Sequence, residues 1–401
     1  MESLITRYKI YHGSVILPNG ILPVGTVLVE NGKIVEIAEG ELDFPGAIEI
    51  NAAGNFISPG FIDIHLHGGG GHDFMDGTVE AFLEIAKTHA RFGTTAMLPT
   101  TLTSEKEDLI LTLEAYQKAH ASHTEGASFL GMHLEGPYFA LSQRGAQDPK
   151  YIRNPDPAEY TDLLENYNCI RRWSAAPELP GALEFADYAR KKGVLVALAH
   201  TDAICEEVET AFQHGYSLAT HFYSAMSGVT RKNAFRYAGA VEAGYLIDEM
   251  DVEIIADGVH LPSSLLRLIH KIKGTSKIAL ITDAMRAAGQ DTDHSVLGHK
   301  DKGLAVIVED GVAKLPDRSA FAGSIATTNR LVRTMLQMTD IALEDIIQMI
   351  SLVPARILQV DQQKGSLSRN KDADILIFDK DINIQMTMVN GRIIYDPNHS
   401  L

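Results

Sequence analysis

The sequence predicts an α/β protein in which a (β/α)8 TIM-type barrel carries a small β-sandwich formed by the N- and C-terminal segments. Eight short apolar runs, rich in β-branched residues, alternate with amphipathic segments in the middle of the chain. Both ends of the chain show instead the alternation and the turn signals of β-hairpins. We therefore assign residues 1–57 and 359–401 to the sandwich and residues 58–358 to the barrel.

Each terminal segment contains an Asn-Gly turn between two alternating strands. Residues 27–37 are expected to form a hairpin around Asn31-Gly32. Residues 386–395 are expected to form another around Asn390-Gly391, after a strand at 373–378. Because chain ends usually lie close together, the two β-rich ends are expected to pack into one unit.

The predicted barrel strands are short and apolar, as expected for parallel strands that are covered on both faces. The eight runs are Ile62–His67, Thr94–Thr100, Phe129–Glu135, Arg172–Glu178, Val194–His200, Ser217–Tyr223, Val252–Gly258 and Ile278–Ala284.

Amphipathic segments follow most of these runs, and several end before a glycine. The predicted helices are Val79–Phe92, Ala182–Lys192, Glu206–His214, Pro262–Lys273, Thr327–Met338 and Leu343–Leu358. A doubly wound open sheet is the alternative architecture. It is disfavoured because no Gly-x-Gly-x-x-Gly sequence stands between a strand and a helix.

The charge and the cysteine content of the chain limit which partners and which compartment we expect. The net charge of −17 argues against nucleic acid, whereas a small anionic substrate needs only a locally positive pocket. The two cysteines, Cys169 and Cys205, form no Cys-x-x-Cys pair, which favours a reducing compartment. No signal peptide and no apolar run of about 20 residues is visible, so we expect a cytoplasmic protein with no membrane partner.

Polar residues stand at the C-terminal ends of most predicted strands, where barrel enzymes place their chemistry. His65 and His67 are two residues apart in a strand, so both imidazoles face the same side. The complete set is His65, His67, Glu135, His200, His221, Asp257 with His260, and Asp283.

Glu135, His200 and His221 form a plausible set of three ligands for a catalytic metal, which leaves one position for water. His65 and His67 are suited to hold a second metal, with Glu135 between the two. Taken singly, each histidine is equally compatible with an ordinary hydrogen bond; taken together, they favour a metal centre. Zinc is the metal we expect, and iron and manganese also suit this set of ligands.

Asp283 ends the last predicted strand. A carboxylate beside a metal-activated water can take its proton and return it to a leaving amine. A helix cap or a hydrogen-bond partner of a ligand is the alternative role for this residue.

Several segments at these strand ends carry a distinctive pattern: Asn51–Gly54 with Ser58–His67, His133–Tyr138, Ala219–Met226, Ile255–His260 and Leu280–Ala284. Together they resemble the N-acetylglucosamine-6-phosphate deacetylases of the amidohydrolase superfamily, and the resemblance extends nearly end to end. It implies an amino-sugar catabolic hydrolase that removes the acetyl group of an N-acetylated amino-sugar phosphate.

The resemblance also implies a role for each matching residue. Glu135, His200 and His221 would bind the principal metal, and Asp283 would be the general base and acid. Some relatives that bind one metal lack the His-x-His pair, whereas this chain keeps His65 and His67, so one or two metals are expected per subunit. The resemblance also implies a homodimer. The implied substrate contacts are Ala146, Gln147, Ser224, Ala225, Asp257, His260, Phe321, Ala322 and Gly323.

The chain departs from its relatives at three places on the substrate side. Ser224 stands where many relatives have Asn, and Gln147 stands where some have His; an amide can donate a hydrogen bond but carries no charge. The segment 230–239 replaces an Arg-Glu-Pro-Gly stretch whose Arg reaches the phosphate, sometimes from the neighbouring subunit. Arg231 and Arg236 are both candidates for that contact.

Other functions remain open at this point. The sugar is alternatively N-acetylgalactosamine 6-phosphate or an unphosphorylated sugar. Another amidohydrolase, such as a cyclic-amide hydrolase or a deaminase, is a further alternative. Many dihydroorotase-like relatives bridge two metals with a carboxylated lysine, but no lysine ends a predicted strand here, whereas Glu135 does. A non-catalytic sugar-phosphate sensor would be expected to lose ligands, yet every expected position is filled.

Overall fold

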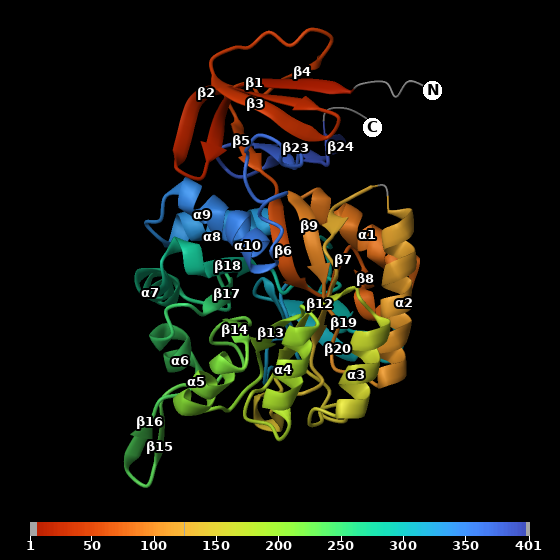
Figure 1. Ribbon diagram of the computed structural model, residues 1–401, viewed down its shortest axis with the longest axis vertical. Coiled ribbons are helices and arrows are strands. Elements are labelled where there is room, and N and C mark those ends of the chain that lie inside the picture. Colours follow the sequence, from red (N-terminus) through yellow and green to blue (C-terminus); the bar gives the residue numbers. More distant parts are fainter. Residues whose placement is uncertain (1–5, 124, 398–401) are drawn as a thin grey trace.

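The computed structural model describes residues 6–123 and 125–397 and confirms the predicted fold class. A curled parallel sheet, surrounded by helices, lies below a smaller mixed sheet that contains both ends of the described chain (Figure 1). The chain passes from the small sheet into the barrel at Gly60, between strands β5 and β6. The limits assigned to the two units stay a prediction.

Eight parallel strands form the barrel. Six of them pair in the order β11-β12-β13-β14-β17-β18, and β6 pairs with β9. Parallel bridges between Thr100 and His133 and between Leu66 and Ala284 join the two groups and close the ring. The barrel strands are β6 (Phe61–Leu66), β9 (Thr94–Pro99), β11 (Met132–Glu135), β12 (Ile170–Ala175), β13 (Leu195–Leu198), β14 (Tyr216–Ala219), β17 (Asp251–Ile255) and β18 (Ile278–Ile281); the short β10 (Ser128–Phe129) pairs with β9.

Several barrel strands end earlier than predicted. Strands β13, β14 and β18 end at Leu198, Ala219 and Ile281, whereas the predicted runs end at His200, Tyr223 and Ala284. His200, His221 and Asp283 have φ values of 48°, 31° and 49°, which lie in the left-handed region. A strand cannot continue through such a residue, so the chain turns at each of these three candidate site residues.

Helices cover the outside of the barrel (Figure 1). Helix α1 begins at the cap residue Thr78, whose side chain accepts a hydrogen bond from the amide of Ala81, and buries Phe82 and Ile85 against the barrel. The helices are α1 (Val79–Ala90), α2 (Lys106–Ser122), α3 (Pro157–Asn166), α4 (Ala182–Lys191), α5 (Cys205–Gln213), α6 (Ala240–Leu246), α7 (Ser263–Lys273), α8 (Thr328–Met338), α9 (Leu343–Ile350) and α10 (Leu352–Ile357), with short 3-10 turns η1 (Phe74–Asp76), η2 (Leu141–Gln143) and η3 (Thr275–Lys277).

Two differences from the predicted helices have physical reasons. The segment predicted as one helix, 343–358, is two helices, because the backbone of Ser351 leaves the helical region at φ −133° and ψ −70°. Helix α6 was not predicted. It contains Gly244, at which an added Cβ would lie 2.6 Å from the ring of Phe222, so packing requires a residue that weakens the helical signal.

The mixed sheet has the strand order β24-β23-β22-β5-β1-β2-β3, with β4 paired to β1. Its two halves face each other across an apolar core that includes Ile10, Val27, Ile57, Ile377 and Met388. The strands are β1 (Arg7–Leu17), β2 (Gly20–Glu30), β3 (Lys33–Glu39), β4 (Ile48–Asn51), β5 (Phe56–Pro59), β22 (Ile375–Phe378), β23 (Ile384–Val389) and β24 (Arg392–Tyr395).

The turns of the two predicted hairpins lie against each other. Asn31 and Asn390 have φ values of 51° and 48°, and each is followed by a glycine with positive φ. An added Cβ at Gly391 would lie 2.4 Å from Cα of Gly32, so both turns need glycine for this approach. The antiparallel pairing of β5 with β22 joins the N-terminal and C-terminal segments in one sheet.

Three short β-structures lie in the connections that follow barrel strands β6, β14 and β18, and none was predicted. They are the pair β7 (Gly68–Gly69) and β8 (His72–Asp73), the hairpin β15 (Thr230–Lys232) and β16 (Phe235–Tyr237), and the sheet β19 (His294–Leu297), β20 (Leu304–Glu309) and β21 (Val312–Lys314). The hairpin β15–β16 extends away from the barrel (Figure 1). Within the described part of the chain, no helix is long and apolar enough to cross a membrane.

Candidate metal and substrate site

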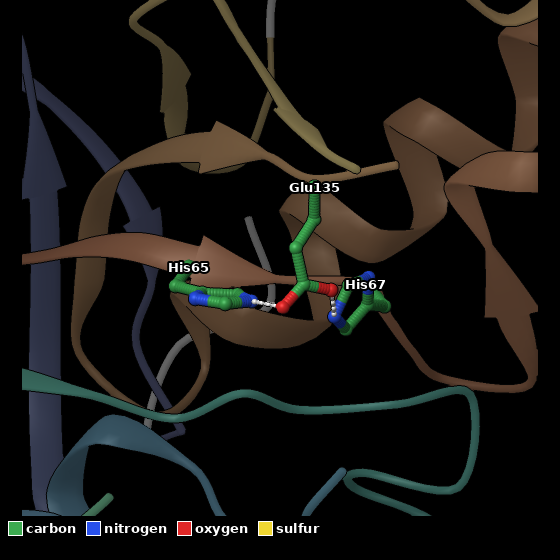
Figure 2. Close-up of side chains that lie close together, drawn as sticks. All are labelled: His65, His67 and Glu135. Atoms are coloured by element: carbon green, nitrogen blue, oxygen red, sulfur yellow. Dashed lines mark ion pairs between the residues drawn. The ribbon is translucent and has the colours of Figure 1, made fainter. Parts of the chain in front are cut away.

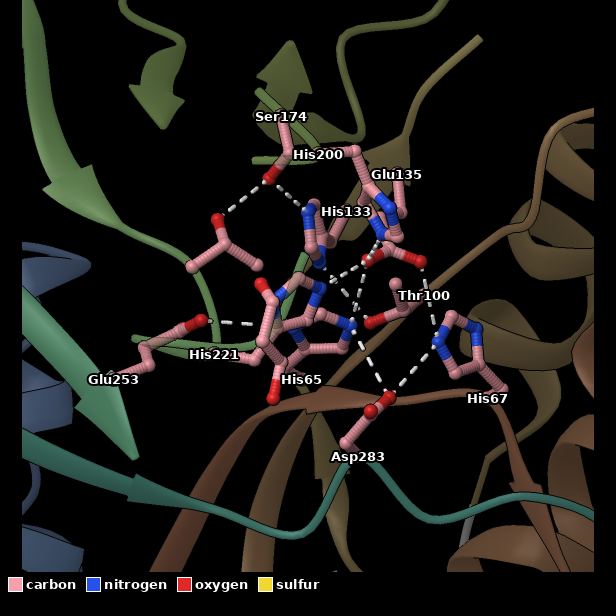
Figure 3. Close-up of polar contacts among 12 residues, drawn as sticks. His65, His67, Thr100, His133, Glu135, Ser174, His200, His221, Glu253 and Asp283 are labelled. Carbon is pink, nitrogen blue, oxygen red and sulfur yellow. Dashed lines mark hydrogen bonds and ion pairs between the residues drawn. The ribbon is translucent and has the colours of Figure 1, made fainter. Parts of the chain in front are cut away.

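Six side chains from five barrel strands converge on one point, with Glu135 at the centre (Figure 3). Oε1 of Glu135 lies 3.0 Å from Nε2 of His221 and 3.3 Å from Nε2 of His200. The same oxygen lies 3.5 Å from Nε2 of His65, and Oε2 lies 3.4 Å from Nε2 of His67. All five side chains are buried. The strand-end residues that the sequence singled out as ligands are therefore brought together.

The ligand atoms fall into two overlapping groups that share Glu135. The first is His65, His67 and Glu135, seen in Figure 2, and the second is Glu135, His200 and His221. Within each group the ligand atoms lie within 4.8 Å of one another. Two imidazole nitrogens and a carboxylate oxygen form a donor set suited to a divalent transition metal, and the shared carboxylate is suited to bridge two such ions.

Two of the imidazoles are oriented by backbone carbonyl groups. Nδ1 of His200 lies 2.7 Å from the carbonyl oxygen of Gln143, and Nδ1 of His221 lies 3.1 Å from that of Ser224. Since a carbonyl only accepts, each Nδ1 carries the proton and donates it. The lone pair of each Nε2 is then directed toward Glu135, as metal coordination requires.

The His65–His67 pair also fits a cation. Both ring nitrogens of His65, and Nδ1 of His67, are buried without a hydrogen-bond partner among the described residues. Buried polar atoms are normally satisfied, and the unpartnered Nε2 of His65 lies 3.5 Å from both Oε1 of Glu135 and Oδ1 of Asp283. A nitrogen between two carboxylates indicates a site built for an ion. The residues present thus fit a divalent metal in both groups.

The electrostatics of the cluster favour positive charge. Burial lowers the pKa of His65, but the charges of Glu135 and Asp283 outweigh burial and raise the pKa of this imidazole to about 10. Burial raises the pKa of Glu135, but the surrounding imidazoles hold the pKa of this carboxyl well below its usual range. An anionic centre of this kind attracts a cation.

Asp283 lies on the opposite side of the histidine pair from Glu135 (Figure 3). Its Oδ1 is 3.2 Å from Nε2 of His67 and 3.5 Å from Nε2 of His65. Burial raises the pKa of Asp283, but the contacts with both histidines outweigh burial and lower it, so the group is a carboxylate at neutral pH. Its backbone carbonyl accepts a hydrogen bond from Ser324, and Gly323 leaves room for it, because a Cβ there would lie 2.8 Å from that oxygen.

Gln147 is held so that its amide nitrogen faces the site. Its Oε1 accepts hydrogen bonds from the backbone amide and the hydroxyl of Thr103, at 3.0 and 2.9 Å. A backbone amide can only donate, which places the oxygen of Gln147 on that side and its NH2 group on the other. The NH2 group donates to Oε2 of Glu135 at 2.8 Å, and its second hydrogen is available to a substrate oxygen.

A cavity of about 560 Å³ opens above these residues. This volume lies in the range of small-molecule sites. The predicted site residues that line it are His67, Glu135, Ala146, Gln147, His200, His221, Ser224, Ala225, His260, Asp283, Phe321 and Gly323. Arg144 also lines it, although the sequence did not single it out. Among the described residues it is the sole lysine or arginine in the lining, and no lysine stands where a carboxylated lysine would bridge two metals.

Three predicted site residues lie behind the wall of the cavity. His65 is fully buried beneath it, and Ala322 is buried in a small apolar cluster. Asp257 also lies outside the lining and holds His260. Its Oδ2 accepts from Nδ1 of His260 at 2.8 Å, and its Oδ1 accepts from the amides of Val259 and His260.

Arg231 and Arg236 are not brought to the cavity of their own chain. They face each other across the hairpin β15–β16, whose strand residues are all exposed, and neither lines the cavity. Their predicted contact with substrate is therefore not made within the single chain.

Several buried polar residues beneath the site were missed. His133 contacts Ser174 at 2.7 Å and Thr100 at 3.2 Å, and Asp63 accepts a hydrogen bond from the Thr282 hydroxyl at 2.5 Å. Arg172 and Glu253 form an ion pair inside the barrel with no exposed surface. A signal for this pair was present, because each charged residue stands inside a run that was predicted to be a buried strand.

This site at the carboxyl ends of eight parallel strands defines a barrel hydrolase of the metal-dependent type. The family model described as Amidohydrolase family matches residues 56–394. The chain belongs to the amidohydrolase family and, within it, to the N-acetylglucosamine-6-phosphate deacetylases.

Three comparisons illustrate this membership. An N-acetylglucosamine-6-phosphate deacetylase of Lysinibacillus sphaericus is 32% identical over 93% of this chain and 94% of its own. An N-acetylgalactosamine-6-phosphate deacetylase of Escherichia coli O157:H7 is 31% identical over 93% and 98%. The structure of a mutant N-acetyl-D-glucosamine-6-phosphate deacetylase of Mycobacterium smegmatis, in complex with N-acetyl-D-glucosamine-6-phosphate, matches with a TM-score of 0.89 at 27% identity, over 97% and 99% of the two chains.

Proposed function

We propose that this chain hydrolyses N-acetylglucosamine 6-phosphate to acetate and glucosamine 6-phosphate with the help of one or two divalent cations. The observation that carries the proposal is the convergence of Glu135, four imidazoles and Asp283 on the floor of one cavity. The relatives named above supply the chemical class of the substrate.

Glu135, His200 and His221 would hold the principal cation, and His65 and His67 would hold the second, with Glu135 shared. When bound, a divalent cation polarises the amide carbonyl and makes water a better nucleophile at neutral pH. Zinc suits these nitrogen and carboxylate donors best, and iron or manganese would also be accepted.

The chain's own groups handle the protons. Asp283, a carboxylate at neutral pH, takes a proton from the attacking water at Oδ1 and later delivers it to the departing sugar nitrogen. The amide of Gln147 donates its second hydrogen to the acetyl oxygen as negative charge develops there. Both groups lie beside the histidine ligands, so no large movement is needed to bring them to the amide.

The sugar phosphate would be anchored at the mouth of the cavity, because an acetamide alone gives little energy for orientation. His260, fixed by Asp257, and Arg144 are the candidate cationic or donating groups of the same chain. Ala146, Ser224, Ala225, Phe321 and Gly323 would contact the sugar.

Arg231 and Arg236 would contact the phosphate from a second copy of the chain. The hairpin exposes Phe235 at 71% of its surface, and Val229, directly before β15, is exposed at 60%. A second copy of the chain that covered the hairpin would bury this apolar surface. A homodimer in which each hairpin reaches the partner's cavity accounts for both features.

N-acetylgalactosamine 6-phosphate is the second candidate substrate. It is favoured by the relative from Escherichia coli O157:H7, whose identity to this chain is 31%, against 32% for the Lysinibacillus enzyme. Ser224, which stands where many relatives have Asn, lines the cavity and is available to select between the two sugars.

The test is acetate release by the zinc-loaded full chain from four sugars: the two N-acetylated epimers, each with and without the 6-phosphate. We expect the highest kcat/KM for N-acetylglucosamine 6-phosphate. A higher kcat/KM for N-acetylgalactosamine 6-phosphate would make that sugar the substrate. Release of no acetate from any of the four sugars would refute the proposed hydrolysis and favour a non-catalytic sugar-phosphate sensor.

A further inference from the structure

Among the four imidazoles of the site, His65 differs in what lies behind it. His200 and His221 face backbone carbonyl groups through Nδ1. Nδ1 of His65 instead faces a carboxylate, because Oε2 of Glu253 lies 3.5 Å away (Figure 3). Neither side chain has any exposed surface, so water does not compete for this contact.

Glu253 is itself held on the other side by Arg172. The guanidinium binds both carboxylate oxygens, with Nη2 at 2.8 Å from Oε2 and Nη1 against Oε1. Nη2 also donates to the Thr220 hydroxyl at 2.8 Å, and Nη1 donates to the carbonyl oxygen of Ile64 at 3.1 Å. The pair therefore touches strands β12 and β17, the end of β14, and the residue that precedes His65 in β6.

The burial of this pair needs a reason beyond stability. Removing two charges from water costs several kcal/mol per ion, and an apolar pair of similar volume is often as stable or more stable. The pair contacts no group of the cavity directly. The ion pair holds a negatively charged oxygen of Glu253 beside Nδ1 of His65, on the side of the ring that faces away from Glu135.

The chemistry of a metal-binding imidazole explains the use of such an oxygen. When Nε2 gives its lone pair to a cation, the proton must stay on Nδ1 and needs an acceptor. For Nδ1 of His65, the facing acceptor is Oε2 of Glu253, at 3.5 Å. Nε2, the opposite ring nitrogen, lies 3.5 Å from Oε1 of Glu135 and 3.5 Å from Oδ1 of Asp283. A carboxylate in this position also makes the imidazole a stronger donor than a carbonyl does.

We propose that Glu253, braced by Arg172, is a positioning residue that makes His65 a metal ligand and so determines whether the His65–His67 pair holds a second divalent cation. The inference rests on the proposed metal-dependent function. Glu253 fixes the Nδ1 proton and the ring direction of His65, and the ligands of the principal cation are oriented independently by the carbonyl groups of Gln143 and Ser224.

The test is the zinc content of the full chain, measured by native mass spectrometry after loading with Zn²⁺, together with the two dissociation constants from chelator competition. We expect two zinc ions per wild-type chain and one per Glu253→Gln chain, with the second site weakened roughly 10- to 100-fold. Asp374→Asn is the matched control, because it breaks a buried ion pair with Lys364 in the mixed sheet and should leave both ions bound.

A double variant guards against misfolding, since Glu253→Gln leaves Arg172 buried without a counter-charge. Arg172→Met with Glu253→Leu replaces both charges by apolar groups and still removes the acceptor for His65. We expect this variant to fold and to bind one zinc ion.

The inference would be overturned if either folded variant bound two ions with wild-type affinity, or if the wild-type chain bound a single ion. Acetate release by the wild-type chain would still support the proposed function in both cases. A wild-type chain with neither bound zinc nor acetate release would refute the proposed function itself.

Discussion

The side-chain amide of Gln147 donates a 2.8 Å hydrogen bond to Oε2 of Glu135, the carboxylate shared by both groups of candidate metal ligands. This contact links the segment that lines the cavity wall to the metal site at its floor. Thr103 fixes the amide in the opposite direction, so the orientation of the NH2 group does not depend on substrate.

Replacing Gln147 with Leu is therefore expected to lower kcat by about 100-fold, which is typical for the loss of one donor to a developing oxyanion. The zinc content of the purified variant should stay at the wild-type value, which separates this effect from loss of metal. A change in kcat of less than threefold would show that the amide does not contact the acetyl oxygen.

Asp283→Asn should keep the bound metal and lose turnover by roughly 100- to 10,000-fold, because an amide cannot accept the proton of the attacking water. Acetate release and metal analysis on the same preparation check this expectation. Near-normal turnover would assign proton transfer to another group.

Arg144→Ala tests the phosphate anchor within the chain. A charge-assisted hydrogen bond contributes about 1.5–3 kcal/mol, so KM for the 6-phosphate sugar should rise roughly 10- to 100-fold. Hydrolysis of the unphosphorylated sugar should be unchanged. Lys150→Ala is the control, because it removes the same charge from the same loop outside the cavity lining. Equal losses on both sugars would exclude a phosphate contact.

The hairpin arginines call for a mixing experiment. Chains carrying Arg231→Ala with Arg236→Ala, and chains carrying Asp283→Asn, should each be poorly active as homodimers. Each mixed dimer contains one cavity with an intact Asp283 and a partner with an intact hairpin. Random exchange of equal amounts makes about half of the dimers mixed, so activity should recover to about a quarter of the wild-type value. No recovery on mixing, with dimer exchange verified by mass spectrometry, would contradict a contribution from the second copy.

His89 predicts a pH dependence of stability. Burial lowers the pKa of His89 to about 4, against 6.5 in the unfolded chain, while Nε2 remains bound to the carbonyl oxygen of Gly68. The unfolded chain binds this proton first, so the contribution is complete above pH 6.5 and is lost as the pH falls from 6.5 toward 4; the full loss corresponds to about 3 kcal/mol. Metal-free His89→Gln should therefore lose less unfolding free energy than metal-free wild type between pH 7 and pH 4.5. Parallel stability curves for the two proteins would exclude this role.

The sequence predicted the barrel strands better than it predicted their ends and the helices around them. Apolar runs revealed all eight strands, because a strand covered on both faces must be apolar along its length. Hydrophobicity does not reveal the left-handed turns at His200, His221 and Asp283, so the predicted strands extend two to four residues beyond the observed ends. Helix α6 was missed because Gly244 serves a contact with Phe222 that only the folded chain makes.

For the candidate site, too, local features could be predicted from the sequence, and contacts between distant segments could not. The spacing of His65 and His67, and the position of each polar residue directly after an apolar run, are local properties, and they were enough to name the ligands. The placement of Arg231 and Arg236 outside the cavity depends on where a hairpin projects. The contact between Glu253 and His65 depends on two strands that are distant in sequence.

The sequence by itself indicated the family by resemblance, and predicted the barrel and the six residues of the candidate site, because these follow from local patterns of residue type and spacing. Only the tertiary structure decided which of these residues share Glu135, which arginine lines the cavity, and which buried charge stands behind His65. The physical reason is that closing a ring of parallel strands sets side chains from distant segments a few ångströms apart, at distances that no local pattern encodes.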